Sequence, residues 1–160
     1  NIEQASQLYQ EILIEKSSNI NSIEDKVALL KINSSHTPYA SRSAIYLSKL
    51  YSQESKNEEA IQELIWASEN AVEESIQSLA YYLLSSLYYV NDNLEGAMTS
   101  ANNIKSIGFQ TLAKDIIGDI YLKKGNEEEA KKSYLESLKS HKGPGDIRKI
   151  LQNKIDSIGK

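Results

Sequence analysis

Cysteine is absent from this chain, and proline and glycine are scarce: of 160 residues, two are proline and seven are glycine. Without cysteine the chain can form neither a disulfide nor a thiolate metal site, and it has no cysteine nucleophile. Proline and glycine are the two residues least favourable inside a helix, so their scarcity permits long helices.

A basic excess and a long apolar run are also missing. The chain has 18 Lys and Arg against 22 Asp and Glu, a net charge of −4. Because phosphate neutralisation needs clustered cations, this balance argues against nucleic acid as the main ligand. The longest apolar run, residues 79–90, includes two serines and four tyrosines. It is too short to span a bilayer and is typical of a buried helix.

Motifs of catalysis are missing as well. There is no GxSxG, no phosphate-binding glycine loop and no HExxH. His36 and His141 fall in expected loops, and we interpret both as ordinary surface residues. Asp115 and Asp119 are four residues apart on one expected helix; such a pair could act as acid and base or bind a cation, but a solvated or concave face is the simpler interpretation. We therefore predict no enzyme, no catalytic residues, no cofactor and no metal site.

A five-residue block is present three times: LSKLY at 47–51, LSSLY at 84–88 and IGDIY at 117–121. Each block ends in tyrosine, and an alanine follows nine residues later. The tyrosines are Tyr51, Tyr88 and Tyr121, and the alanines are Ala60, Ala97 and Ala130. The copies lie 37 and 33 residues apart, a period typical of helical hairpin repeats.

Close packing explains the residue types of the block. The large residue makes an apolar contact, and the small one (Ser48, Ser85 or Gly118) lets the second helix of a hairpin approach the first. The tyrosine lies one turn further along the same face. The pattern resembles the tetratricopeptide repeat, and it predicts an all-α solenoid of three such hairpins with capping helices at both ends.

The expected organisation is one domain in three parts. Residues 1–37 form N-terminal capping helices, residues 38–142 hold the three repeats, and residues 143–160 form a C-terminal capping helix. The repeats run over 38–72, 75–105 and 110–140. Asn1 is not an initiator Met, so we expect the native start to lie upstream.

First helices of stacked repeats line a concave groove, and the block's register predicts which side chains face it. These residues make the groove basic at one end, aromatic in the middle and acidic at the other: Arg42, Lys49, Tyr82, Tyr89, Asp115 and Asp119. We predict a polypeptide-binding surface anchored on the two tyrosines. The alternative is that one or both tyrosines pack against a neighbouring helix.

The C-terminal half also resembles a narrower family. Residues 106–138 and 150–158 are similar to the YfgM family in Gly108 with an aromatic at 109, Gly118-Asp119, Gly125 with Ala130, and Lys154-Ile155. Thr37-Pro38-Tyr39-Ala40 fits the same pattern.

This resemblance implies a function that the residues alone do not. Members of that family are ancillary subunits of the SecYEG translocon, anchored in the bacterial inner membrane with the repeat domain in the periplasm beside the membrane chaperone PpiD. The expectation is thus a non-catalytic, periplasmic protein-binding domain that holds partner proteins or emerging chains during export. A cytoplasmic adaptor that binds a peptide in the same groove is the alternative.

Overall fold

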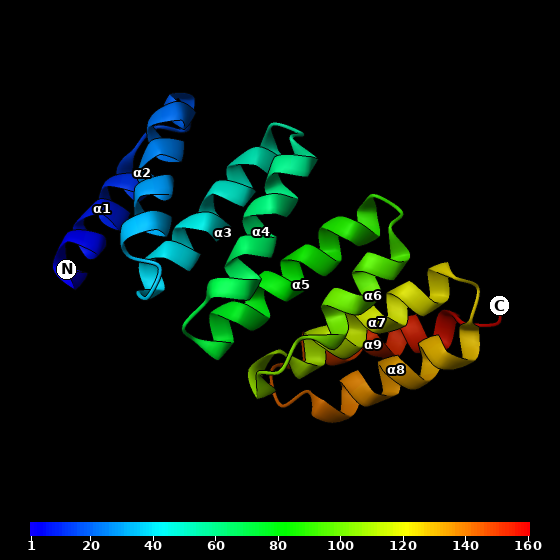
Figure 1. Ribbon diagram of the computed structural model, residues 1–160. Helices are drawn as coiled ribbons and strands as arrows, with labels where there is room; N and C mark the ends of the chain where they lie inside the picture. Colours follow the sequence, from blue (N-terminus) through cyan, green and yellow to red (C-terminus); the bar gives the residue numbers. More distant parts are fainter. The chain divides into compact units, whose positions relative to one another are not determined.

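The computed structural model describes residues 1–160, and its regular structure is entirely helical. The chain divides into two compact units, Asn1–Tyr81 and Tyr82–Lys160, which are described separately. Figure 1 labels the nine α-helices along the chain.

The first unit contains two helical hairpins and the start of α5. Its helices are α1 (Ile2–Ile14), α2 (Ile20–Asn33), α3 (Pro38–Gln53), α4 (Asn57–Asn70) and the first turns of α5 (Glu74–Val90). Helix α3 packs on α4 and also on α1 and α2 (Figure 1). The core between α1, α2 and α3 is aliphatic and includes Ile12, Ile23, Leu30 and Leu47, all buried. Tyr9 and Tyr39 join α1 to α3, with ring centroids 5.6 Å apart.

The second unit contains the rest of α5 and four more helices. These are α6 (Leu94–Asn102), α7 (Gln110–Lys123), α8 (Glu127–Ser140) and α9 (Gly145–Ser157). Helix α7 forms a hairpin with α8, and α9 packs on α8. One cluster joins α6 and α7 through Ala97, Ile117 and Ile120. Another joins α8 and α9 through Tyr134 and Leu151.

The three hairpin turns share one backbone geometry. Four residues after the block tyrosine the chain enters the left-handed region, at Ser55 (φ 60°), Asp92 (φ 61°) and Gly125 (φ 78°). The N–H of the next residue donates to the tyrosine carbonyl at 2.9 Å in all three turns, from Lys56 to Tyr51, from Asn93 to Tyr88 and from Asn126 to Tyr121. This is the six-to-one bond of a Schellman motif, which satisfies a free carbonyl at a helix end.

The same turns explain the nine-residue gap. The carbonyl oxygens of Lys56, Asn93 and Asn126 accept from the N–H groups of the block alanines, at 3.0–3.1 Å. The residue that donates to the tyrosine carbonyl follows the tyrosine by five positions, and the block alanine follows that residue by four. Together these two steps give the gap of nine. In the second and third turns the asparagine side chain also caps the following helix, accepting from the N–H of Gly96 and of Glu129.

The small residue of each block lies where two helices approach closely. Ser85 is fully buried, and its hydroxyl donates to the Ala97 carbonyl of the facing helix at 2.7 Å. A Cβ at Gly118 would overlap the ring of Tyr134 on α8. The alanines Ala60, Ala97 and Ala130 have no exposed surface. Within each hairpin, therefore, the spacing between helices depends on these side chains being small.

The turns predict opposite effects of two substitutions. Ser55→Gly should stabilise the protein by about 0.5–1 kcal/mol, because glycine removes the cost of left-handed backbone at a residue with a Cβ. Gly125→Ala should destabilise it by a similar amount, and only through backbone strain, since no atom lies within 4 Å of the added Cβ. Urea denaturation followed by circular dichroism measures both. Changes of the same sign would contradict the shared turn geometry.

Candidate partner-binding surfaces

The predicted groove residues of the first unit lie on α3. The Arg42 guanidinium donates to both carboxylate oxygens of Glu73, at 3.0 and 2.8 Å. Lys49 is exposed. Because Arg42 already has a carboxylate partner, Lys49 is the freer of the two cations for a ligand.

The predicted anchors Tyr82 and Tyr89 are both half-buried on α5 and pack against the apolar cluster of α6 and α7. The Lys123 ammonium lies 4.6 Å from the centroid of the Tyr89 ring and donates to the Tyr89 carbonyl at 3.1 Å. Each tyrosine therefore supports the fold and remains partly exposed. Their role as anchors for a partner stays a prediction.

The predicted acidic end of the groove is an ion-paired cluster. Lys154, on α9, donates to Asp115 at 2.7 Å and to the two oxygens of Asp119 at 2.9 and 3.0 Å. The Tyr134 hydroxyl, from α8, donates to Asp119 at 2.6 Å. The same ammonium lies 5.3 Å from the centroid of the Tyr134 ring. One cation and one phenol therefore hold two carboxylates and tie three helices together.

Burial and hydrogen bonding shift the pKa of three groups in this cluster. Burial raises the pKa of Asp115, although Lys154 acts in the opposite direction. Burial alone would lower the pKa of Lys154, but its hydrogen bonds to Asp115 and Asp119 outweigh this and raise it. The pKa of the Tyr134 hydroxyl is raised by burial and by its bond to Asp119. At neutral pH the lysine is therefore charged, and the cluster is a structural clasp on α9.

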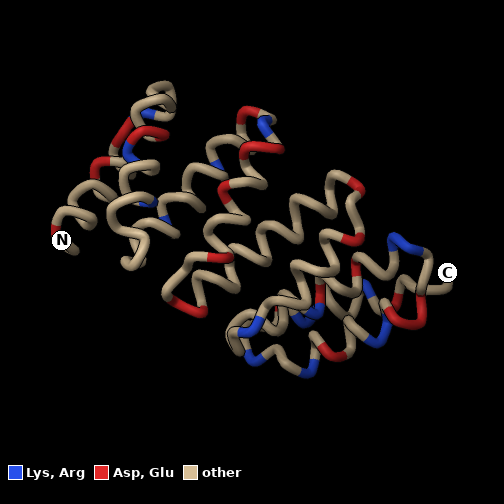
Figure 2. Tube along the Cα trace, viewed as in Figure 1, with Lys and Arg blue, Asp and Glu red and all other residues tan.

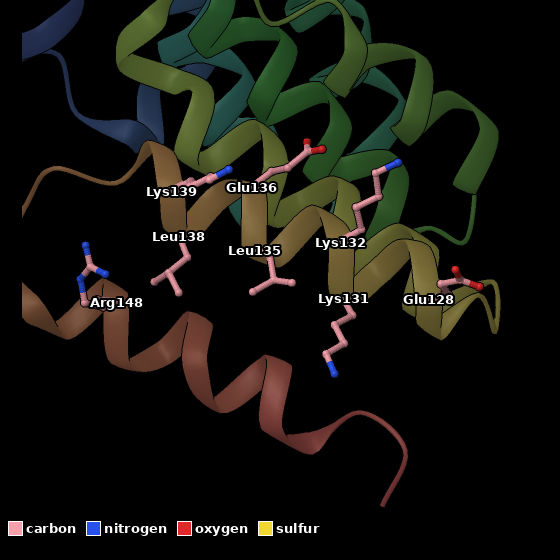
Figure 3. Close-up of a pocket in the computed structure, with 8 residues that line it drawn as sticks. All are labelled: Glu128, Lys131, Lys132, Leu135, Glu136, Leu138, Lys139 and Arg148. Atoms are coloured by element: carbon pink, nitrogen blue, oxygen red, sulfur yellow. The ribbon is translucent and has the colours of Figure 1, made fainter.

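A second concave feature lies along the exposed side of α8, where Arg148 of α9 borders it. It is an open groove of about 690 Å³. It is lined by Glu128, Lys131, Lys132, Leu135, Glu136, Leu138, Lys139 and Arg148. Figure 3 shows Leu135 and Leu138 pointing from α8 toward α9, and Arg148 pointing back from α9 toward α8. Leu135 is 46% exposed, so the floor of this groove presents apolar surface to a ligand.

One sequence interpretation is wrong. His141 is not a surface residue: it is 8% exposed, and its Nε2 lies 2.9 Å from the Pro144 carbonyl oxygen. The imidazole thereby closes the turn between α8 and α9. No group of three or more His, Cys, Asp or Glu is placed to hold a metal ion. None of the helices combines the length and apolar character that crossing a bilayer requires.

The helical hairpins, their shared turns and the buried block residues agree with the comparison to known families. A family model described as a tetratricopeptide repeat-like domain matches residues 1–160. The chain belongs to this family. No curated protein matches the chain significantly.

Solved structures with tetratricopeptide-like repeats share the fold. The TPR-like repeats of a Podosopora anserina kinesin light chain align with a TM-score of 0.67 and 15% identity, over 96% of this chain and 81% of that one. A MamA structure aligns with a TM-score of 0.63 and 16% identity, over 96% and 90% of the two chains. A second MamA structure gives 0.54 and 15%, over 85% and 86%. The prediction of an all-α tetratricopeptide-like fold is confirmed.

A tetratricopeptide repeat-like fold is typically a non-catalytic scaffold for protein–protein interaction. The partners of such a domain are proteins. Function therefore depends on the chemistry of its exposed surfaces, and the groove along α8 is a surface that the repeat register did not predict. The sequence signal for it is Leu135, an apolar residue on the polar side of α8.

The clasp predicts that Lys154→Met lowers the free energy of unfolding by about 1–3 kcal/mol at pH 7, because two half-buried carboxylates lose their cation. Lys154 has a raised pKa in the folded state, so its contribution is complete below the pKa of an unfolded lysine, about 10.4, and is lost as pH rises through the folded value. The difference in unfolding free energy between wild type and Lys154→Met should therefore shrink above pH ~10.

Chemical denaturation from pH 7 to 12 measures this effect. Lys149→Met is the matched control, because Lys149 is an exposed lysine of the same helix. If Lys154→Met were no more destabilising than Lys149→Met, the clasp would contribute nothing to stability.

Proposed function

We propose that this chain is the protein-binding domain of an inner-membrane-anchored, periplasmic accessory to the protein-export translocon. In this role it holds partner proteins, among them the SecYEG translocon and a PpiD-like membrane chaperone, or chains that emerge during export. The match of the tetratricopeptide repeat-like model to residues 1–160 carries the binding function. The similarity of residues 106–138 and 150–158 to the YfgM family supports the cellular role.

The arrangement of charged groups agrees with binding rather than catalysis. The carboxylates of Asp115 and Asp119 are both ion-paired with Lys154. Exposed apolar side chains remain instead, including Val90 at the end of α5 and Leu135 on α8. A scaffold needs such surface, since apolar area removed from water drives most protein association.

A crosslinking pull-down tests the role, with the full-length protein in its native membrane. Wild type should recover translocon subunits or a membrane chaperone. Tyr82→Ala/Tyr89→Ala should lose at least about 70% of that recovery if these rings anchor the partner, since aromatic anchors contribute ~2 kcal/mol or more. Tyr81→Ala is the matched control, a half-buried tyrosine of the same helix.

Three outcomes separate the possibilities. Recovery that the double variant loses, while its thermal unfolding stays cooperative, supports both the export role and the tyrosine anchors. Recovery that survives in the double variant keeps the role and moves the interface to another surface. Recovery of only cytoplasmic partners contradicts the export role and favours an adaptor.

A further inference from the structure

We propose that the groove along α8 binds an acidic amphipathic helix of a partner protein. The inference rests on the protein-binding function proposed above and adds a surface and the chemistry of its occupant. The groove was not among the sites that the repeat register predicts, and it lies entirely within the second unit.

The floor of the groove suits an apolar ridge. Leu135 is 46% exposed, and Leu138 is half-buried beside the cluster of Tyr134 and Leu151. The polar groups around them are the ends of long, flexible side chains. A small-molecule site is usually enclosed and has a few fixed polar groups. An open apolar groove along a helix is instead the shape that receives another helix.

The rim carries surplus positive charge. Four cations and two carboxylates line the groove, and Glu136 is already paired with Lys114 at 3.1 Å. Lys131, Lys139 and Arg148 make no ion pair within the chain. Residues 131–149 hold six Lys and Arg against two acids, in a chain whose net charge is −4. Charge complementarity therefore favours a partner with Asp or Glu beside its apolar stripe.

The first unit contains an internal precedent for an acidic helix beside Leu138, whose position in α8 corresponds to that of Lys31 in α2. Helices α2 and α8 both have 14 residues, and their buried positions correspond in register: Ile23, Val27 and Leu30 match Ala130, Tyr134 and Ser137. Helix α3 follows α2 as α9 follows α8. The trio α1–α2–α3 therefore corresponds to α7–α8–α9.

In the first unit a fourth helix, α4, lies against this trio. It packs on α3 and reaches α2 through an ion pair between Glu63 and Lys31. The Lys31 ammonium also lies 5.0 Å from the centroid of the Trp66 ring. Helix α4 has four glutamates and no Lys or Arg, and Figure 2 shows its tube marked red and not blue. An acidic helix against a cation on the preceding helix is thus a contact that this chain already makes.

One difference distinguishes the corresponding place in the second unit. The fourth residue of α3 is Ser41, which is buried, and the fourth residue of α9 is Arg148, which is exposed. A long cationic side chain therefore stands where the corresponding residue of α3 is small and buried. Arg148 points across the groove toward α8 (Figure 3), where it can hold a partner carboxylate with two hydrogen bonds.

A peptide copied from α4 provides a defined probe. The probe is residues 57–70 with an alanine-rich turn at each end to keep it helical, and the control peptide carries Gln at its four Glu positions. Binding to the full 160-residue chain is measured by fluorescence anisotropy. We expect the Glu peptide to bind at least about tenfold more tightly than the Gln peptide, and rising salt to reduce this difference.

Variants of the chain locate the site. Lys131→Glu/Arg148→Glu and, separately, Leu135→Asp should each weaken binding of the Glu peptide at least about tenfold. Lys16→Glu/Lys124→Glu changes the net charge equally away from the groove and should alter the affinity less than about twofold. Equal affinity for the two peptides, no binding, or binding that the groove variants do not change would overturn the inference.

A photocrosslinker at position 135 of the full-length protein, in its native membrane, identifies the natural occupant. A crosslinked segment with an apolar helical stripe flanked by Asp or Glu supports the inference. A lipid adduct, a second copy of this chain, a segment without acids, or no adduct contradicts it. The peptide assay uses the purified chain and does not depend on the export role. If the peptide binds as expected but the pull-down recovers no translocon subunit, only the export role is contradicted.

Discussion

The repeats depend on one backbone hydrogen bond, donated in each hairpin turn to the carbonyl of the block tyrosine. The donor is the N–H of Lys56, Asn93 or Asn126. That bond reverses the chain after a left-handed residue and fixes where the second helix begins. Because the same turn residue then accepts from the block alanine, the alanine always meets the first helix at the same level. The small residues Ser85 and Gly118 let the two helices of the hairpin approach each other closely at this level.

The two ends of the chain use this arrangement differently. In the first unit, the place beside α2 and α3 is filled by α4, whose Glu63 pairs with Lys31. In the second unit, α9 is held by Lys154 on Asp115 and Asp119, and Arg148 borders the adjoining groove. One hairpin geometry therefore produces a closed packing at one end and an exposed cationic groove at the other.

The sequence could predict the hairpins because their determinants are local. Tyrosine, turn and alanine lie within ten residues, so Tyr121, Gly125 and Ala130 are visible as a pattern. The clasp is not local: Lys154 is 35 residues from Asp119, and only the packing of α9 brings them together. The groove could not be predicted either, because no local pattern shows whether another part of the chain covers Leu135. The burial of His141 could not be predicted, because a loop residue is usually exposed and only the fold brings its ring to the Pro144 carbonyl.

Amide hydrogen exchange measured by NMR tests the role of the turns most directly. The N–H groups of the three turn donors and of Ala60, Ala97 and Ala130 should exchange slowly, as protected as amides inside the flanking helices, because each donates within the chain. Exchange of the turn donors at the rate of unprotected loop amides would contradict the account, since the hairpins would then be held by side-chain packing alone.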